Sequence, residues 1–325
     1  MHLVYEEKDM KKKIDFKTFV RENVITLVLI ALVVFFSVAS RRFLTMSNIF
    51  LVIRQVSVLG VVALGAAIIS LSGGLDISLG NQMTLFAVVC CDLMINRGWN
   101  MWLCMLIAVV LSLVVGFING TIIIKFNINP FIATLGYGTI FSGISFGITG
   151  GYQISKFSDT FKYISQGYIG PVPVPVIIML IILLIGSFIL NKTYIGRYIY
   201  SVGGNSEAAR LSGINVDKVK IGSYMAGSFL AAIAAIMMAA RLNNVNCTCG
   251  DSYTFDAMTA IMLGGVSVRG GKGKISGILV GMLIIGVLNN GLTLIGMESF
   301  IQGILKGIIM IVAICIDSII YNKKS

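Results

Sequence analysis

The sequence predicts an all-α, polytopic integral membrane protein with about ten transmembrane helices. Of its 325 residues, 57% are hydrophobic and only 12% are charged. Apolar runs of about 20 residues, enough to cross a hydrocarbon core of ~30 Å, recur along the chain. Glycine-rich turns and most of the basic residues stand between these runs. A soluble domain of this size could not leave so much apolar surface in water, so the composition excludes that class.

Taken in order, the apolar runs predict one span in each of these segments: 24–39, 49–70, 79–95, 101–124, 131–149, 172–190, 221–240, 255–268, 275–295 and 301–320. The first and the eighth are short, as a half-helix that begins or ends inside the membrane would be, so the count is nine or ten. We expect three parts: a cytosolic segment at 1–23, a transmembrane domain at 24–320 and a cytosolic tail at 321–325. The first segment is too long and too acidic for a simple signal peptide, so the first span should be retained.

The basic residues decide the orientation of the chain, whose net charge is +11. With the N-terminus in the cytosol, most Lys and Arg fall at the termini and in the cytosolic loops, above all 191–220. The outer side then keeps only Arg41, Arg42, Arg97, Lys156, Lys162 and Arg241. The positive-inside rule therefore places both termini in the cytosol and the loop 150–171 outside. In this setting the positive charge indicates orientation and contact with anionic headgroups, and no nucleic-acid partner is expected.

The motif GGLDISLG at 73–80 interrupts the apolar run between the second and third spans. It contains one carboxylate but no Lys or Arg, which fits a break partly sunk in the membrane. Irregular backbone is tolerated there only where it is buried in protein or lines water. Asp76 is then either a helix cap for the third span or a polar group on a solute route, and the cap is the simpler explanation. Ser78 is a second candidate cap.

The polar stretch 192–220 predicts a two-turn helix. Asn205 can cap it, residues 206–212 contain no helix breaker, and Gly213 supplies the left-handed residue that ends it. Glu207 and Arg210 suit the helix dipole and can pair with each other. A helix of two turns is too short to be stable alone in water. Either the rest of the chain holds it, as a connector lying on the membrane, or a docking protein does.

Five motifs, in the same order, resemble the permease subunits of ribose-type ABC sugar importers, in the branched-chain-amino-acid/ribose permease superfamily. They are LSGGLDISLG at 71–80, NPFIATLG at 129–136, KTYIGRYIYSVGGNSEAARLSGINVDKVK at 192–220, IMLGGVSVRGGKGKISGILVG at 261–281 and LNNGLTLIG at 288–296. The resemblance covers most of the chain from about Phe43 onward. It is specific for the family and not for the sugar.

The resemblance implies a permease subunit in a bacterial inner (plasma) membrane that moves a monosaccharide, such as ribose or a related sugar, into the cytosol. It implies three protein partners: a second copy of the chain, a cytosolic ABC ATPase with two fused ATP-binding halves, and an extracytoplasmic sugar-binding protein. That binding protein would dock on the loop 150–171, although the composition of this loop alone favours a solvated linker. The loop 191–220 would couple to the ATPase through Gly203, Gly204, Asn205, Glu207, Ala208, Ala209, Arg210, Leu211 and Gly213.

Short internal matches favour two duplicated halves of opposite orientation. GGLDISLG at 73–80 is similar to GGVSVRGG at 264–271, and GFIN at 116–119 is similar to GVLN at 286–289. The second pair falls in the fourth and ninth spans, five apart, as an inverted repeat requires. Glycines also recur at four-residue spacing, which lets helices approach closely in lipid, and one such face could join two copies of the chain.

No catalytic constellation is present. The chain has one His, scattered acids and no G-x-x-x-x-G-K-[ST] loop, so it is not expected to be an enzyme and a partner must hydrolyse the ATP. Only Cys247 and Cys249 lie in a loop, so we expect no disulfide, metal or cofactor. The alternative function is an ion-gradient-driven secondary transporter of a small polar solute, which should pair acids and bases within several spans. The candidates for lining a translocation route are Asp76, Ser78, Asn289, Asn290 and Gln302.

Overall fold

The computed structural model describes residues 16–322, with side chains from 25 to 315. The predicted N-terminal segment up to residue 15, and the tail from residue 323, lie outside the described residues. Each predicted span is a helix, and the helices are α1 (Phe16–Ala39), α2 (Met46–Leu71), α3 (Leu79–Ile95), α4 (Met101–Lys125), α5 (Pro130–Thr149), α7 (Val174–Lys192), α10 (Val216–Leu242), α11 (Asp251–Leu263), α12 (Ile275–Leu294) and α13 (Ser299–Asn322). The fold class is therefore confirmed as all-α and polytopic.

The helices form an inner and an outer layer. By length and composition, six of the described helices can cross a membrane: α2, α4, α5, α7, α10 and α12. Among these, α2, α10 and α12 are mostly buried inside the protein, and α2 and α10 meet where Gly65 faces Gly227. Helices α4, α5 and α7 leave large apolar side chains such as Leu106, Leu135 and Leu184 exposed. A bundle in lipid is expected to show this distribution, because hydrocarbon solvates its outer face.

The outer end of the bundle carries a small folded cap built from the loop 150–171 and its neighbours. It contains β1 (Ile154–Ser155), α6 (Asp159–Gln166), β2 (Tyr168–Ile169) and β3 (Val172–Pro173), and β1 pairs antiparallel with β4 (Asn244–Val245). Phe157 and Phe161 are buried edge to face, and Ser165 Oγ donates to Met237 O at 2.6 Å. This loop is thus packed onto the bundle and is more than a solvated linker.

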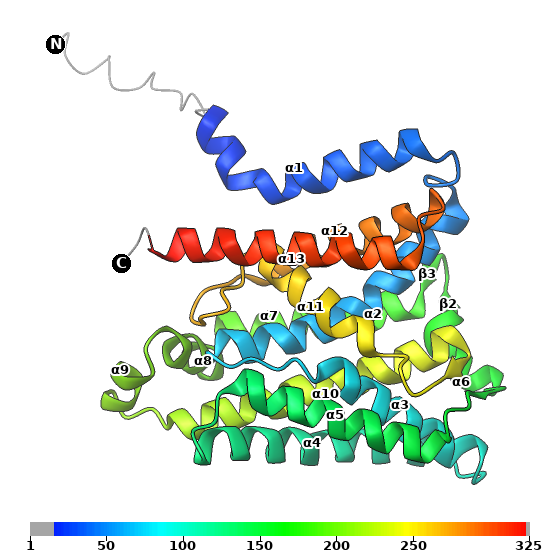
Figure 1. Cartoon of the computed structure of the whole chain (residues 1–325), viewed down its shortest axis with the longest axis horizontal. Helices are drawn as coiled ribbons and strands as arrows, with labels where there is room; N and C mark the ends of the chain where they lie inside the picture. The colour runs from blue at the N-terminus through cyan, green and yellow to red at the C-terminus, as the bar shows by residue number, and fades with distance from the viewer. Residues whose placement is uncertain (1–15, 323–325) are drawn as a thin grey trace.

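The opposite end carries α8 (Tyr194–Gly204) and α9 (Ser206–Leu211), and the start of α1 and the end of α13 point toward the same end (Figure 1). By the charge argument above, this end is cytosolic. Helix α2 ends here and α10 begins here, so these two central helices run in opposite directions.

The helices α2 to α5 and α10 to α13 form two halves related by a constant shift of 170 residues, the separation of Asn81 and Asp251. The shift places α2 on α10, α3 on α11, α4 on α12 and α5 on α13. It also matches GFIN at 116–119 with GVLN at 286–289, as predicted. The other predicted match is wrong, because 73–80 lies between α2 and α3 whereas 264–271 lies between α11 and α12. The true counterpart of 73–80 is 243–250, which shares few residue types with it.

Candidate functional site

The two short helices α3 and α11 begin against each other inside the bundle. The backbone N–H of Gly80 donates to Thr254 Oγ1 at 2.9 Å, and that of Gly250 donates to Thr84 Oγ1 at 2.9 Å. A Cβ on either glycine would collide with the backbone oxygen of the other, so the close approach requires glycine at both positions. The first turns of two half-helices thus meet at one point, held by reciprocal hydrogen bonds.

The segment 72–78 leads to this point from the cytosolic end. Figure 1 shows it as an extended strand of chain that runs from the end of α2 back into the bundle before α3 begins. Gly73 ends α2 with a left-handed backbone (φ 78°), and Tyr224 OH of α10 donates to Leu75 O at 3.1 Å. The expected break between the second and third spans is therefore real, and its backbone is held by protein rather than exposed to lipid.

A cavity of about 610 Å³ lies beside the meeting point, between α3, α5 and α11. Its polar lining residues are Asn81, Thr134, Thr139, Ser142, Asp251 and Thr254. Asn81 Nδ2 donates to Asp251 Oδ1 at 3.2 Å, which joins the two half-helices across the cavity wall. The positive ends of two helix dipoles lie at the same place. A polar cavity at the start of broken helices, with amide, hydroxyl and carboxylate groups, suits a hydroxyl-rich solute.

The predicted route residues Asp76 and Ser78 lie behind this cavity and not on its surface. Asp76 is buried and accepts hydrogen bonds from Ser78 N, Ser78 Oγ and Gln82 Nε2, at 2.6 to 2.9 Å. Gln82 Oε1 in turn accepts from Ser228 Oγ of α10 at 2.6 Å. Asp76 therefore fastens the turn before α3 to the core, whereas the N-cap residue of α3 is Ser78, whose side chain makes no capping hydrogen bond. Ile77, between the two, lines the cavity.

The other predicted route residues lie in α12 and α13, away from the residues that line the cavity. Asn290 exchanges two amide hydrogen bonds with Asn48 of α2, at 2.8 and 2.9 Å. Asn289 Nδ2 donates to Asp256 Oδ2 at 3.0 Å, and Gln302 Nε2 donates to Met297 O at 2.8 Å. The predicted set is thus divided among separate networks, and Asp76 and Ser78 alone adjoin the cavity.

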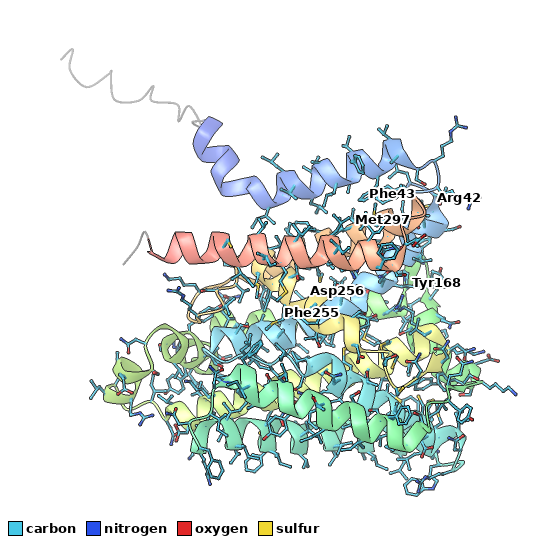
Figure 2. All side chains as sticks on the ribbon, in the orientation of Figure 1. Arg42, Phe43, Tyr168, Phe255, Asp256 and Met297 are labelled. Carbon is cyan, nitrogen blue, oxygen red and sulfur yellow. The ribbon has the colours of Figure 1, made fainter. Side chains whose placement is uncertain are left out.

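Asp256 also forms an ion pair within the membrane domain. Lys306 Nζ of α13 lies 2.9 and 3.2 Å from its two carboxylate oxygens. Asp256 follows the cavity residue Phe255 directly on α11 (Figure 2). Lys306 and Asp256 are 50 residues apart, so no local sequence pattern pairs them.

The sequence analysis did not predict the six polar residues of the cavity, which are Asn81, Thr134, Thr139, Ser142, Asp251 and Thr254. A signal for some of them exists: Gly80-x-x-x-Thr84 and Gly250-x-x-x-Thr254 share one pattern at the shift of 170 residues. The three intervening positions differ too much to show the match by similarity. Cys247 and Cys249 are free thiols, and the residues that the structure describes contain no cluster able to hold a metal ion.

The predicted short helix is present as α9 in the cytosolic loop. Asn205 Oδ1 accepts from Ala208 N at 3.0 Å, and Gly213 has the expected left-handed backbone (φ 83°). Arg210 pairs with Asp217 at 3.7 Å and not with Glu207. Glu207 and Ala208 are exposed on α9, and Gly204 precedes it.

Two apolar residues of α9 point in opposite directions. Ala209 is buried in a small cluster with Val202 and Val216, which holds α9 against α8 and α10. Leu211 is 89% exposed. The chain itself therefore stabilises the two-turn helix, and Leu211 is the large apolar side chain that α9 presents to the outside.

A junction of glycines connects this loop to the break before α3. Gly271 N donates to Leu71 O at 3.0 Å, and Gly203 lies against both. Side chains at Gly203, Gly270 or Gly271 would collide with backbone of the neighbouring segments. The loop 191–220, the end of α2 and the turn after α11 thus meet through close backbone contacts, at the start of the segment that leads to the cavity.

Comparisons with known proteins agree with this architecture. Residues 48–314 match the family described as branched-chain amino acid transport system / permease component. The ribose import permease protein of Haemophilus influenzae is 37% identical, covering 91% of this chain and 93% of that protein. The galactose/methyl galactoside import permease protein of the same organism is 34% identical (94% and 96% covered), and a probable ABC transporter permease protein of Escherichia coli is 30% identical (97% and 96% covered). No solved structure matches the chain. The chain therefore belongs to the branched-chain amino acid transport system / permease component family.

Proposed function

We propose that the chain is the permease subunit of an ABC importer and carries a monosaccharide, ribose or a related sugar, through the polar cavity beside Gly80 and Gly250. The cavity carries the proposal, because it gathers amide, hydroxyl and carboxylate groups in a mostly apolar membrane domain. Ribose and galactose import permeases among the relatives support a sugar as the solute. As a bacterial inner-membrane transport subunit without a phosphate-binding loop, the chain needs an ATPase partner.

In this proposal, the cytosolic partner is an ABC ATPase with two fused ATP-binding halves, and it docks on α9. Exposed Leu211 offers the apolar contact, with Glu207, Ala208 and Arg210 around it. Movement of α9 reaches the cavity through the glycine junction and the segment 72–78. An extracytoplasmic sugar-binding protein docks on the folded outer cap, which presents exposed Tyr152 and Tyr163.

A second copy of the chain closes the cavity on its α5 side. Gly136, Gly143 and Gly147 of α5 have open space where a Cβ would stand, as do Gly303 and Gly307 of α13. Such faces allow close helix contact in lipid, and α5 also lines the cavity. A homodimer would place the two cavities on a shared central route.

Reconstituted vesicles test the function. Uptake of labelled ribose should require ATP, the ATPase and the binding protein together. Thr139→Trp should block uptake by filling the cavity, while Val110→Trp, on the lipid-facing side of α4, should transport like the parent. Normal uptake by Thr139→Trp would remove the cavity from the route.

The docking helix has its own test. Leu211→Glu should abolish ATPase association without loss of folded protein, whereas Ser201→Glu, exposed on α8, should associate normally. Ala209→Trp should act differently, because it forces a large ring into the packed cluster and unseats α9. Full association by Leu211→Glu would mean that α9 is only a connector.

An ion-gradient-driven secondary transporter remains the second candidate, because the pair Lys306–Asp256 is the kind of intramembrane charge pair that it requires. A proton or sodium gradient should then drive uptake by the purified chain alone. If the chain is an ABC permease, vesicles that contain it alone should show no uptake under either gradient.

A further inference from the structure

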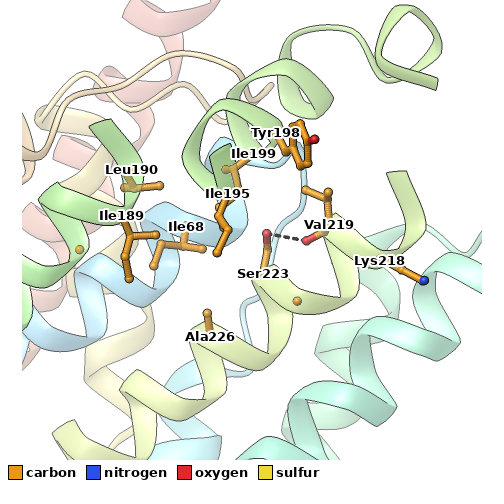
Figure 3. A pocket seen from close by; sticks show the side chains of 12 residues that line it. Ile68, Ile189, Leu190, Ile195, Tyr198, Ile199, Lys218, Val219, Ser223 and Ala226 are labelled. Carbon is orange, nitrogen blue, oxygen red and sulfur yellow. Dashed lines mark hydrogen bonds between the residues drawn. The ribbon is translucent and has the colours of Figure 1, made fainter. Parts of the chain in front are cut away.

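Two cavities apart from the proposed sugar route differ in the charge on their walls. One, of about 450 Å³, lies under α8 at the cytosolic end and is lined mainly by apolar side chains (Figure 3). Its hydroxyl group at Ser223 donates to Val219 O at 2.9 Å, and the Lys218 side chain extends away from the other labelled residues. The other, of about 530 Å³, lies at the outer end and has Arg54 and Arg241 on its walls. Of the two, the outer cavity is the one that presents charge to a ligand.

Gln166 of the outer cap holds the two arginines next to each other. Its backbone oxygen accepts from Arg54 Nη2 at 3.0 Å, and its side-chain amide donates to Arg241 O at 3.1 Å. The Arg54 guanidinium also lies over the ring of Tyr168, 4.7 Å from the ring centroid. Arg241 Nη2 donates to Tyr253 OH at 3.2 Å. Neutral partners therefore fix both guanidinium groups on the wall of one cavity.

Each guanidinium has a donor that the chain leaves unused. The Nε atoms of Arg54 and Arg241 are buried and have no hydrogen-bond partner. Within the part of the chain that the structure describes, no carboxylate lies within ion-pair distance of either arginine. Holding two partly buried cations side by side without a counter-ion is unfavourable, because each loses water and they repel each other. A bound anion would offset both costs.

The cavity lies at the level of the outer membrane surface. Helix α2 has 26 residues, and its length of about 39 Å exceeds the ~30 Å hydrocarbon core. Its outer turns therefore reach the lipid headgroups, and Arg54 lies about 12 Å from its first residue. Arg241 is the last residue but one of α10, at the same end of the bundle, where Figure 2 places Tyr168. An anion at this depth is within reach of the headgroup phosphates.

The rest of the cavity wall is mostly apolar. Met46, Leu51 and Leu242 line the cavity and are exposed, as expected for side chains in contact with acyl chains. Phe50 packs edge to face on Tyr168 with ring centroids 5.8 Å apart, and aromatic rings are typical of the membrane–water interface. Two cations beside such a surface complement a ligand that has a negative head and a hydrocarbon tail.

We propose that Arg54 and Arg241 bind the phosphate of an anionic phospholipid, such as phosphatidylglycerol, in the outer leaflet of the membrane. Arg suits phosphate because its planar guanidinium offers two parallel N–H donors. The acyl chains lie along Met46 and Leu51. A lipid with net negative charge is preferred to a zwitterionic one, because no carboxylate lines the cavity to receive a choline cation. The lipid joins α2, α10 and the outer cap, and this role does not depend on which solute is carried.

The test is lipid retention by the full chain, purified in mild detergent and offered phosphatidylglycerol and phosphatidylcholine with identical acyl chains. Native mass spectrometry should show preferential retention of phosphatidylglycerol, on the order of fivefold for each arginine. The double variant Arg54→Gln/Arg241→Gln should lose this preference. Equal retention of both lipids by the parent would overturn the proposal.

A control variant separates the cavity from general surface charge. Arg97→Gln/Lys156→Gln removes two cations from the same side of the protein, at exposed positions that do not line the cavity. It should retain phosphatidylglycerol like the parent. A loss of preference as large as that of the arginine double variant would mean that net charge, and not this site, selects the lipid.

Two further measurements separate the lipid from other anions. Glycerol phosphate, which has the phosphate but no acyl chains, should fail to displace bound phosphatidylglycerol when added in excess; displacement would show that the occupant is a soluble phosphate ester. If the arginines instead serve a carboxylate of the sugar-binding protein, the double variant should lose affinity for that protein yet keep its preference for phosphatidylglycerol. That result, too, would refute the lipid site.

A measurement without any variant guards against misfolding. Phosphatidylglycerol with a photoreactive group near the glycerol end of its acyl chain should crosslink to peptides that contain Phe50, Leu51 or Leu242. Crosslinks confined to α8 and α9, at the cytosolic end, would contradict the proposed position of the lipid.

Discussion

The two halves of the membrane domain are built alike at their centre and differently at their outer edge. Asp76 accepts hydrogen bonds from the backbone and hydroxyl of Ser78, and its counterpart Asn246 does the same with Thr248. Gly73 and its counterpart Asn243 both end a central helix with a left-handed backbone. The turn before a half-helix is thus preserved in geometry, although the side chains that make it have changed.

The outer edges differ in their charge. In the second half, α13 is tied to α11 and α12 through Lys306, Asp256 and Asn289. The equivalent positions in the first half are Gly136, Phe86 and Asn119. Asn119 is buried, and neither of its amide atoms has a hydrogen-bond partner. Backbone geometry therefore determines how the two half-helices meet at Gly80 and Gly250, the joint of the two halves. Side-chain chemistry determines how firmly each outer helix is attached.

Gly80 and Gly250, at the joint, should be the positions where substitution harms folding most. Gly80→Val and Gly250→Val should each prevent accumulation of folded protein, because the new side chain collides with backbone that cannot move aside. Gly222→Val, where a Cβ has open space and which lies outside the proposed dimer face, is the control for protein level. Size-exclusion profiles in detergent measure the outcome. If one of the joint variants folded normally, the two halves would not be equivalent at the joint.

Breaking the ion pair between Lys306 and Asp256 should cause the next largest loss of stability. Lys306→Met leaves the Asp256 carboxylate largely buried without its cation, which should destabilise the protein by about 3 to 5 kcal/mol. The double variant Lys306→Met/Asp256→Leu should recover most of that loss, because no unpaired charge remains. Thermal unfolding of the detergent-solubilised protein measures both. No recovery in the double variant would show that the pair does more than neutralise charge.

Loss of the Asp76 side chain should destabilise the protein more than loss of its counterpart in the second half, Asn246. Asp76→Ala leaves Ser78 and Gln82 without their buried acceptor and should cost about 2 to 3 kcal/mol. Asn246→Ala removes an exposed turn acceptor and should cost only about 1 kcal/mol. Equal losses in the two variants would contradict the assignment of Asp76 to a buried network.

The smallest of these losses should appear at the equivalent asparagines of the two halves. Asn289→Ala removes a hydrogen bond to a carboxylate and should cost about 2 kcal/mol. Asn119→Ala removes a buried amide without a partner and should be close to neutral. The difference in unfolding temperature between these variants measures the comparison. A loss at Asn119 as large as that at Asn289 would reveal a contact made only in another state of the protein.

Features that depend on neighbouring residues could be predicted from the sequence alone. The ten apolar runs gave the ten helices, because membrane thickness sets their length. Asn205 and Gly213 predicted both ends of α9, because capping and left-handed backbone are local properties. The break at 73–80 was likewise evident from its glycines and its single carboxylate.

Which of these elements contact one another could be learned only from the tertiary structure. Asn81 and Asp251 are 170 residues apart, and Lys306 and Asp256 are 50 apart, so no local pattern pairs them. The direction of a small side chain such as Ala209 depends on how α9 lies against α8 and α10, which the helix alone does not fix. Composition and spacing act along the chain, whereas a cavity forms from side chains that packing brings together across it.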